Sequence, residues 1–286
     1  MLSIKHILFP FDFSVQGVQA APFVRALAQR FNARVTLFST GAPAASLSPA
    51  DIGVPRDDGG RQRVPQLQLE LEQALPTELA GTQVDRVADA GDPAYRILDF
   101  AHTHGVDLIM MPTHGVGLFR RLLLGSVAAK VLHDARCPVW TATHAEEEHG
   151  KPHPRSVLCA VDDGAGSADL MQWAEAFSAH IGARLSLLHV VEPITDWPSL
   201  EHERVRQDQF RLEARARMES IQATAGVVAP LRVAVGDIVA TVAEDAWQED
   251  ADLVVVGRGN QAESHARGRS RAYAISRRSP CPVLSA

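Results

Sequence analysis

Residues 107–127 have the sequence DLIMMPTHGVGLFRRLLLGSV and combine a strand, a glycine-rich loop and the start of a helix. Asp107 to Met111 form a short apolar run bounded by turn residues, which is typical of a buried strand. Glycines stand at 115, 117 and 125, and Ser126 opens an apolar-periodic stretch. Glycine lets a backbone approach a ligand closely, and the start of a helix presents N–H groups and a positive dipole end. This order of elements predicts an anion site, with phosphate as the usual guest.

Outward from this stretch, the chain repeats itself. Residues 4–14 resemble 155–164, and each copy places an aspartate, Asp12 or Asp162, after an apolar strand. The segment VADAGDPAYRILDFAHTHGVDLIMMP parallels VAVGDIVATVAEDAWQEDADLVVVG, and RCPVWTAT parallels PCPVLSA. Self-similarity on this scale predicts a tandem duplication.

Each copy alternates strand and helix five times, which predicts an α/β fold with a parallel sheet and helices on both faces. The expected strands are 4–9, 34–39, 84–88, 107–111 and 138–142, then 156–161, 184–190, 231–235, 252–256 and 282–285. Residues 66–73 alternate in polarity like a strand, but their place between two parallel strands favours a helix. Asp92 and Asp237 follow turn glycines and are expected to cap helices. We expect domains at 1–143 and 155–286, joined by a polar linker at 144–154.

Composition limits the class of protein. The chain has 286 residues, 46% of them apolar and 22% charged, and a net charge of −6. No apolar run approaches the roughly 20 residues that span a bilayer, so no membrane partner is expected. The acidic balance argues against general nucleic-acid binding. Three cysteines without a paired spacing suit a reducing cytoplasm.

The chain is similar to the universal stress protein (UspA) family in its tandem, two-domain form. The resemblance rests on Asp12, on the loop P-T-H-G-(9 residues)-G-S at 112–126, and on CPV at 137–139. The family pattern is G-x2-G-x9-G-(S/T), and Pro112 stands at its first glycine. The resemblance implies two Rossmann-like, adenine nucleotide alpha hydrolase-like domains with strand order 3-2-1-4-5. It also implies ATP between strands 1 and 4, where ligands of wound sheets bind.

The resemblance assigns roles to individual residues. Asp12 would accept hydrogen bonds from the adenosine portion, while Gly125, Ser126 and Val127 would bind phosphate oxygens. Other candidates would line the adenine side and the loop wall: Pro10, Ser39, Met111, Thr113, His114 and Gly115. Arg120 and Arg121 could add phosphate charge. The second copy offers Asp162, Gly257, Gly259 and Ser270.

Two departures from the pattern leave alternatives open. Pro112 lacks an N–H; if that donor faced the ligand, binding weakens by about 1.5–3 kcal/mol, and otherwise proline is harmless. In the second copy, Arg269 replaces the last glycine. The loop of the second copy contains four arginines, Arg258, Arg267, Arg269 and Arg271. They either bind phosphate through their guanidinium groups or form a set of salt bridges.

The favoured hypothesis is a cytoplasmic stress-response protein that binds ATP, with or without Mg²⁺, as a regulatory ligand. No Walker A motif and no candidate base occur, so little or no hydrolysis is expected. The two copies would form an intramolecular pseudo-dimer, and a homodimer stays open. One alternative is a nucleotide-free protein-interaction module; another is a slow ATPase or autophosphorylating protein with Ser126 as acceptor. His102 and His104 have no metal-ligand spacing and are expected on the surface.

Overall fold

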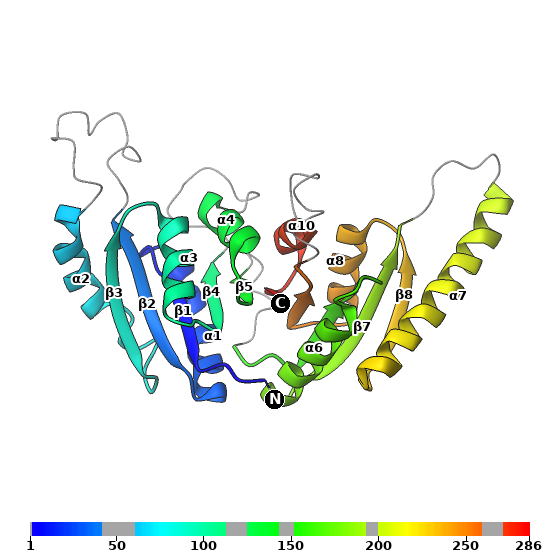
Figure 1. Ribbon diagram of the computed structural model, residues 1–286, viewed down its shortest axis with the longest axis horizontal. Helices are drawn as coiled ribbons and strands as arrows, with labels where there is room; N and C mark the ends of the chain where they lie inside the picture. Colours follow the sequence, from blue (N-terminus) through cyan, green and yellow to red (C-terminus); the bar gives the residue numbers. More distant parts are fainter. Residues whose placement is uncertain (1, 42–60, 113–124, 143–151, 193–199, 259–270) are drawn as a thin grey trace. The chain divides into compact units, whose positions relative to one another are not determined.

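The structure is a computed structural model that describes residues 2–41, 61–112, 125–142, 152–192, 200–258 and 271–286 (Figure 1). The chain divides into two compact units. The first comprises Ser3–Ala142, and the second lies within residues 143–286. Each unit contributes five parallel strands, and each is described by itself.

The sheet of the first unit has the strand order β3-β2-β1-β4-β5, and every pair is parallel. This is the order that the family resemblance implies. Its strands are β1 (His6–Pro10), β2 (Arg34–Gly41), β3 (Val84–Ala90), β4 (Leu108–Pro112) and β5 (Val139–Ala142). The central strands β1 and β4 are buried along their whole length. That is the burial expected of a parallel sheet covered on both faces.

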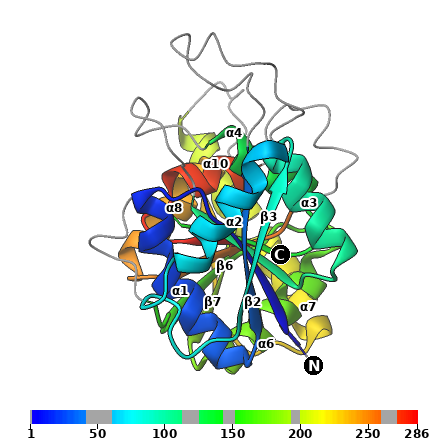
Figure 2. The ribbon, with the colours of Figure 1, turned by 90° about the vertical axis from the view of Figure 1, so that its left-hand side faces the viewer.

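Helices cover both faces of this sheet. They are α1 (Val15–Phe31), α2 (Val64–Gln73), α3 (Pro93–Thr103) and α4 (Ser126–Asp134), with a short 3₁₀ turn, η3 (Arg61–Arg63), before α2. In Figure 2, where the β3 edge faces the viewer, α1 lies on one side of the sheet and α3 on the other. Helix α4 packs on α3 and β5. The fold is therefore the doubly wound α/β class that the alternating pattern predicts.

The second unit repeats the arrangement as β8-β7-β6-β9-β10, again with parallel pairs. Its strands are β6 (Ser156–Ala160), β7 (Arg184–Val191), β8 (Leu231–Val235), β9 (Leu253–Val256) and β10 (Val283–Ser285). Its helices are α6 (Ser167–Ile181), α7 (Leu200–Ala225), α8 (Ile238–Gln248) and α10 (Arg271–Arg278). Helix α6 packs on α7, and α8 packs on α10.

Helix boundaries follow local chemistry. Asp92 accepts a hydrogen bond from the Tyr95 amide at 2.8 Å, and Asp237 accepts one from the Ala240 amide at 2.8 Å, so both predicted caps are confirmed.

Helix α2 covers the ambiguous residues 66–73, because burial of Leu71 against the sheet outweighs the local alternation. The largest strand shift is at β1, where 4–9 was expected and His6–Pro10 is found.

One carboxylate in each unit fixes the start of the central strand. Asp107 Oδ2 accepts hydrogen bonds from the amides of Lys5 (2.7 Å) and His6 (3.0 Å). In the second unit, Asp252 Oδ2 accepts from the amides of Arg155 (2.8 Å) and Ser156 (3.1 Å). The duplication thus preserves this tie between the turn before the fourth strand and the first strand.

Among the described helices, none is long and apolar enough to cross a bilayer.

Candidate functional site at the carboxyl edge of the first sheet

The central strands of the first unit end side by side. Leu8 of β1 pairs with Ile109 of β4, and continuing this register brings Pro10 level with Met111. After β1 the chain turns toward β2 and β3, whereas after β4 it turns toward β5. Wound sheets bind ligands beyond the carboxyl ends of their strands at such a switch point.

Asp12 lies directly beyond the end of β1 and is exposed. Its Oδ1 accepts a hydrogen bond from the Ser14 amide at 3.1 Å, and Ser14 Oγ in turn accepts from the Gly17 amide at 3.1 Å, which caps α1. The Phe11 amide donates to the Phe38 carbonyl at 2.8 Å and ties this turn to β2. The carboxylate is therefore held in a defined position at the sheet edge.

The turn that carries Asp12 is closely packed. Phe13 adopts a left-handed conformation with φ of 60°, and its ring lies 4.9 Å from that of Phe11. Phe11 also covers Gly17, where an added Cβ would come within 2.8 Å of the ring. Ser39 of β2 is buried, one residue beyond the partner of Pro10. Pro10, Asp12, Ser39 and Met111 thus lie at one edge of the sheet.

Helix α4 begins at the same edge, because a helix between two parallel strands runs back along them. Gly125 is its N-cap residue, and among the described residues no side chain caps the helix. By contrast, Ser14 caps α1 and Asp92 caps α3. Ser126 is exposed and Val127 is half-buried at the first two helical positions. Within the part of the chain that the structure describes, the first amides of α4 are thus not engaged by a capping side chain, as an anion site requires.

Pro112 belongs to the strand rather than to the loop. It is the last residue of β4, it is buried, and it lies opposite Ala142 of β5. A proline at a strand end is compatible with the sheet, because it removes a donor only where the ladder stops. Thr113, His114 and Gly115 lie outside the described residues, as do Arg120 and Arg121.

At the equivalent edge of the second unit, Asp162 forms hydrogen bonds within its own turn. Asp162 Oδ1 accepts from the Gly164 amide at 3.1 Å and from Ser167 Oγ at 2.7 Å, which binds the carboxylate to the start of α6. His189 stands where the first unit has Ser39, and its Nδ1 lies 2.8 Å from the Val161 carbonyl oxygen. The Asp162 carboxylate is therefore bonded to its own turn and to the first residue of α6.

The remaining candidates of the second unit are partly described. An added Cβ at Gly257 would lie 3.2 Å from Leu170, so this glycine allows close packing on α6. Arg271 forms an ion pair with Glu192 at 3.1 Å, which supports a salt-bridge role for that arginine. Gly259, Ser270, Arg267 and Arg269 lie outside the described residues.

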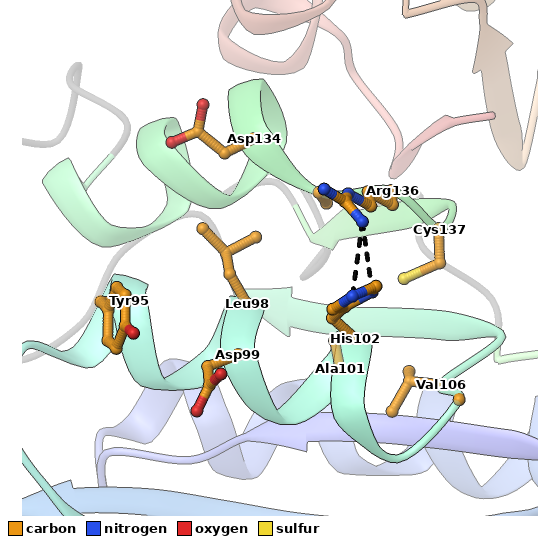
Figure 3. Close-up of a pocket in the computed structure, with 11 residues that line it drawn as sticks. Tyr95, Leu98, Asp99, Ala101, His102, Val106, Asp134, Arg136 and Cys137 are labelled. Atoms are coloured by element: carbon orange, nitrogen blue, oxygen red, sulfur yellow. Dashed lines mark hydrogen bonds between the residues drawn. The ribbon is translucent and has the colours of Figure 1, made fainter.

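A separate pocket opens between α3 and α4, with a volume of about 420 Å³ (Figure 3). His102 and Arg136 meet in its wall, where the guanidinium lies 3.4 Å from the ring Nε2. The other lining residues are Tyr95, Leu98, Asp99, Ala101, Gly105, Val106, Asp134, Ala135 and Cys137. None of the candidate ligand-binding residues predicted from sequence lines this pocket. Its walls come from two helices and the turns that follow them, including Cys137 of the CPV segment.

Buried cysteines offer no nucleophile. Burial raises the pKa of both Cys159 and Cys281 to about 12, so these thiols stay protonated near neutral pH. Within the described ranges, no three His, Cys, Asp or Glu side chains cluster as a metal site would require.

The duplicated unit, its strand order and its switch-point edge define a tandem doubly wound α/β protein. Residues 3–142 and 154–285 each match the universal stress protein family. The chain therefore belongs to that family.

Individual relatives agree with this assignment. A universal stress protein of Methanocaldococcus jannaschii, MJ0531, is 31% identical over 149 residues, covering 50% of this chain and 85% of the relative. One from Thermus aquaticus is 35% identical over 140 residues, covering 47% of this chain and 96% of the relative. The crystal structure of a universal stress protein from Archaeoglobus fulgidus superposes with a TM-score of 0.70 at 19% identity, covering 99% of this chain and 96% of that one. The structural likeness supports the tandem fold.

Proposed function

We propose that the first unit binds ATP as a regulatory ligand at the carboxyl edge of β1 and β4, with little or no hydrolysis. The observation that carries the proposal is the start of α4, where no described side chain caps the first amides at the edge that carries Asp12. Amides and the positive end of a helix dipole suit the phosphates of a nucleotide.

In this proposal the described residues divide the work. Gly125, Ser126 and Val127 hold phosphate oxygens through backbone amides and the Ser126 hydroxyl. Asp12 accepts hydrogen bonds from the adenosine portion. Pro10 and Ser39 line the adenine side, and Met111 belongs to the loop wall. Pro10 and Met111 are buried at the strand ends, and Ser39 is 6% exposed.

The second unit binds ATP more weakly or not at all in this proposal. Its loop carries Arg269 where the first copy has Gly125, so the residue that lets a backbone approach a phosphate closely is missing from the second copy.

Calorimetry with Mg-ATP on the full chain tests the proposal with a matched pair of variants. The wild type should bind one nucleotide per chain. Asp12→Asn should weaken binding by about tenfold or more, as the loss of about 1.5–3 kcal/mol implies, whereas Asp162→Asn should leave it unchanged. Absence of heat with the wild type would favour the nucleotide-free interaction module.

A further variant addresses the open question about Pro112. If the missing N–H matters, Pro112→Gly should tighten ATP binding by about tenfold or more. If it does not, affinity should stay within twofold, because the residue then serves only the end of β4. Release of labelled phosphate, or label on Ser126, would instead support the slow-ATPase or autophosphorylation alternative.

A further inference from the structure

His6 is a buried histidine at the amino end of β1, on the opposite edge of the sheet from Asp12. His6 is 3% exposed, and its imidazole ring lies edge-on to the ring of Phe100 of α3, with the two centroids 6.4 Å apart. Buried polar side chains require hydrogen-bond partners. The imidazole has three, from β2 and from the turn after α3.

Two of these partners make opposite demands on one nitrogen. Nδ1 lies 3.1 Å from Nη2 of Arg34 and 3.3 Å from the carbonyl oxygen of His104. A guanidinium can only donate, so its contact requires a lone pair on Nδ1. A carbonyl oxygen can only accept, so its contact requires a proton on Nδ1. The two bonds cannot be made at the same time.

The third partner is compatible with either state. Nε2 lies 2.8 Å from Oγ1 of Thr36, and a hydroxyl can accept from a protonated Nε2. In the neutral ring, Nε2–H donates to Thr36 and Nδ1 accepts from Arg34. In the imidazolium, both nitrogens carry protons, so Nδ1–H donates to the His104 carbonyl and the guanidinium is repelled.

Arg34 has a second partner within reach. Its Nη1 lies 3.8 Å from Oδ2 of Asp85 on β3, at the limit of an ion pair. We propose that His6 is a proton-operated switch, in which protonation of Nδ1 from solvent transfers Arg34 from His6 to Asp85. The transfer replaces a tie between β1 and β2 with a tie between β2 and β3.

The charges around His6 determine whether the folded state gains or loses stability when this histidine is protonated. Burial and Arg34 lower the pKa of His6, whereas the His104 carbonyl, Asp107 and Asp85 oppose that shift. Asp107 faces the backbone of His6 and Lys5, and the exposed His104 ring stacks on Phe100. Because the folded pKa lies below the unfolded value of 6.5, the folded state loses stability as pH falls below about 6.5. The loss is complete below the folded pKa.

The duplication supplies an internal control. Strand pairing aligns His6 with Arg34 in the first unit and Ser156 with Arg184 in the second. Ser156 does not titrate in this range, so the second unit has an arginine at the same place without the switch.

Nitrogen NMR of the histidine rings in the full chain tests the proposal, with the His6 signals assigned by their loss in His6→Ser. At pH 8, Nδ1 of His6 should be unprotonated, and it should gain a proton only below pH 6.5. Arg34→Gln should raise the midpoint and Asp85→Asn should lower it, because these charges act in opposite directions. Arg184→Gln should leave the midpoint unchanged. A proton on Nδ1 at pH 8, or a midpoint that Arg34→Gln does not move, would overturn the proposal.

Urea unfolding between pH 5 and 8 provides a second readout. The wild type should lose stability below pH 6.5 relative to His6→Ser. Equal pH dependence in the two proteins would also overturn the proposal.

Discussion

Arg232 Nη1 lies 2.7 Å from Oδ1 of Asp245, and the carboxylate of this pair is almost completely buried, whereas the guanidinium side chain is half exposed. Asp245 occupies the position on α8 that Phe100 occupies on α3, after the same interval from the capping aspartate. Burial raises the pKa of Asp245, and Arg232 counteracts that rise. The arginine therefore offsets part of the cost of burying this carboxylate.

Replacing Arg232 should destabilise the folded protein, because the buried Asp245 carboxylate then has lost its ion-pair partner. We expect Arg232→Met to reduce the free energy of unfolding by roughly 1–3 kcal/mol at pH 7, less than for a fully buried pair because Arg232 is half exposed. In the folded protein the pKa of Asp245 lies above its unfolded value of 3.8. The free energy of unfolding therefore falls as pH rises from the unfolded pKa to the folded pKa. Urea unfolding should therefore show a smaller deficit at pH 4.5 than at pH 7. Asp245→Leu in the same chain should recover part of the loss, and equal deficits at both pH values would contradict the assignment.

Gly17 should not tolerate a methyl group. In Gly17→Ala, the new Cβ would lie 2.8 Å from the buried Phe11 ring. Overpacking typically costs about 1–3 kcal/mol, against about 1 kcal/mol gained in helix propensity. We expect a net loss of about 1 kcal/mol in chemical denaturation. Phe11→Leu should suppress the effect in the double variant. A loss that persists unchanged in the Phe11→Leu double variant would refute the steric explanation.

The two capping aspartates should behave alike. Asp92→Ala and Asp237→Ala each remove a 2.8 Å hydrogen bond to the first turn of a helix, α3 or α8. Each variant should lose about 1 kcal/mol of stability, the usual value of such a cap. Thermal unfolding followed by circular dichroism measures the change. Asp→Asn at either position should retain most of it, because an amide oxygen can also cap; a loss in Asn equal to that in Ala would argue for charge instead.

The three cysteines should differ in reactivity. Cys159 and Cys281 are buried with a pKa of about 12, whereas Cys137 is partly exposed in the pocket between α3 and α4. Iodoacetamide at pH 8 should therefore modify Cys137 first, because the thiolate is the reactive species and must be reached. Peptide mass spectrometry identifies the labelled site. Labelling of Cys159 or Cys281 should require urea, and labelling of either in the native protein at the rate of Cys137 would contradict their burial.

The sequence predicted the elements whose chemistry is local. The strand LIMMP is apolar throughout, and the turns Gly91-Asp92 and Gly236-Asp237 specify caps by residue type alone. The repeat then extended each assignment to its partner copy. The same reasoning brought Asp12 and Met111 to one edge, because parallel strands end together.

What the sequence did not predict depends on tertiary neighbours. The pair of His6 and Arg34 joins residues 28 apart through strand register, and His102 meets Arg136 across two helices. The hydrogen bond from Ser167 Oγ to Asp162 Oδ1 was not predicted either. Such contacts depend on register and side-chain direction, which apolar periodicity does not specify.

The tie from Asp107 to the amides of Lys5 and His6 spans 102 and 101 residues of chain. In a nascent chain leaving the ribosome, the hydrogen bonds at the start of β1 can therefore form only after residue 107 has emerged, because Asp107 and β4 are otherwise absent. Contacts at this sequence distance also slow folding, since a long loop must close before they form. The repeated tie at Asp252 imposes the same delay on the second unit, so each half of the gene product must be almost fully synthesised before its sheet can close.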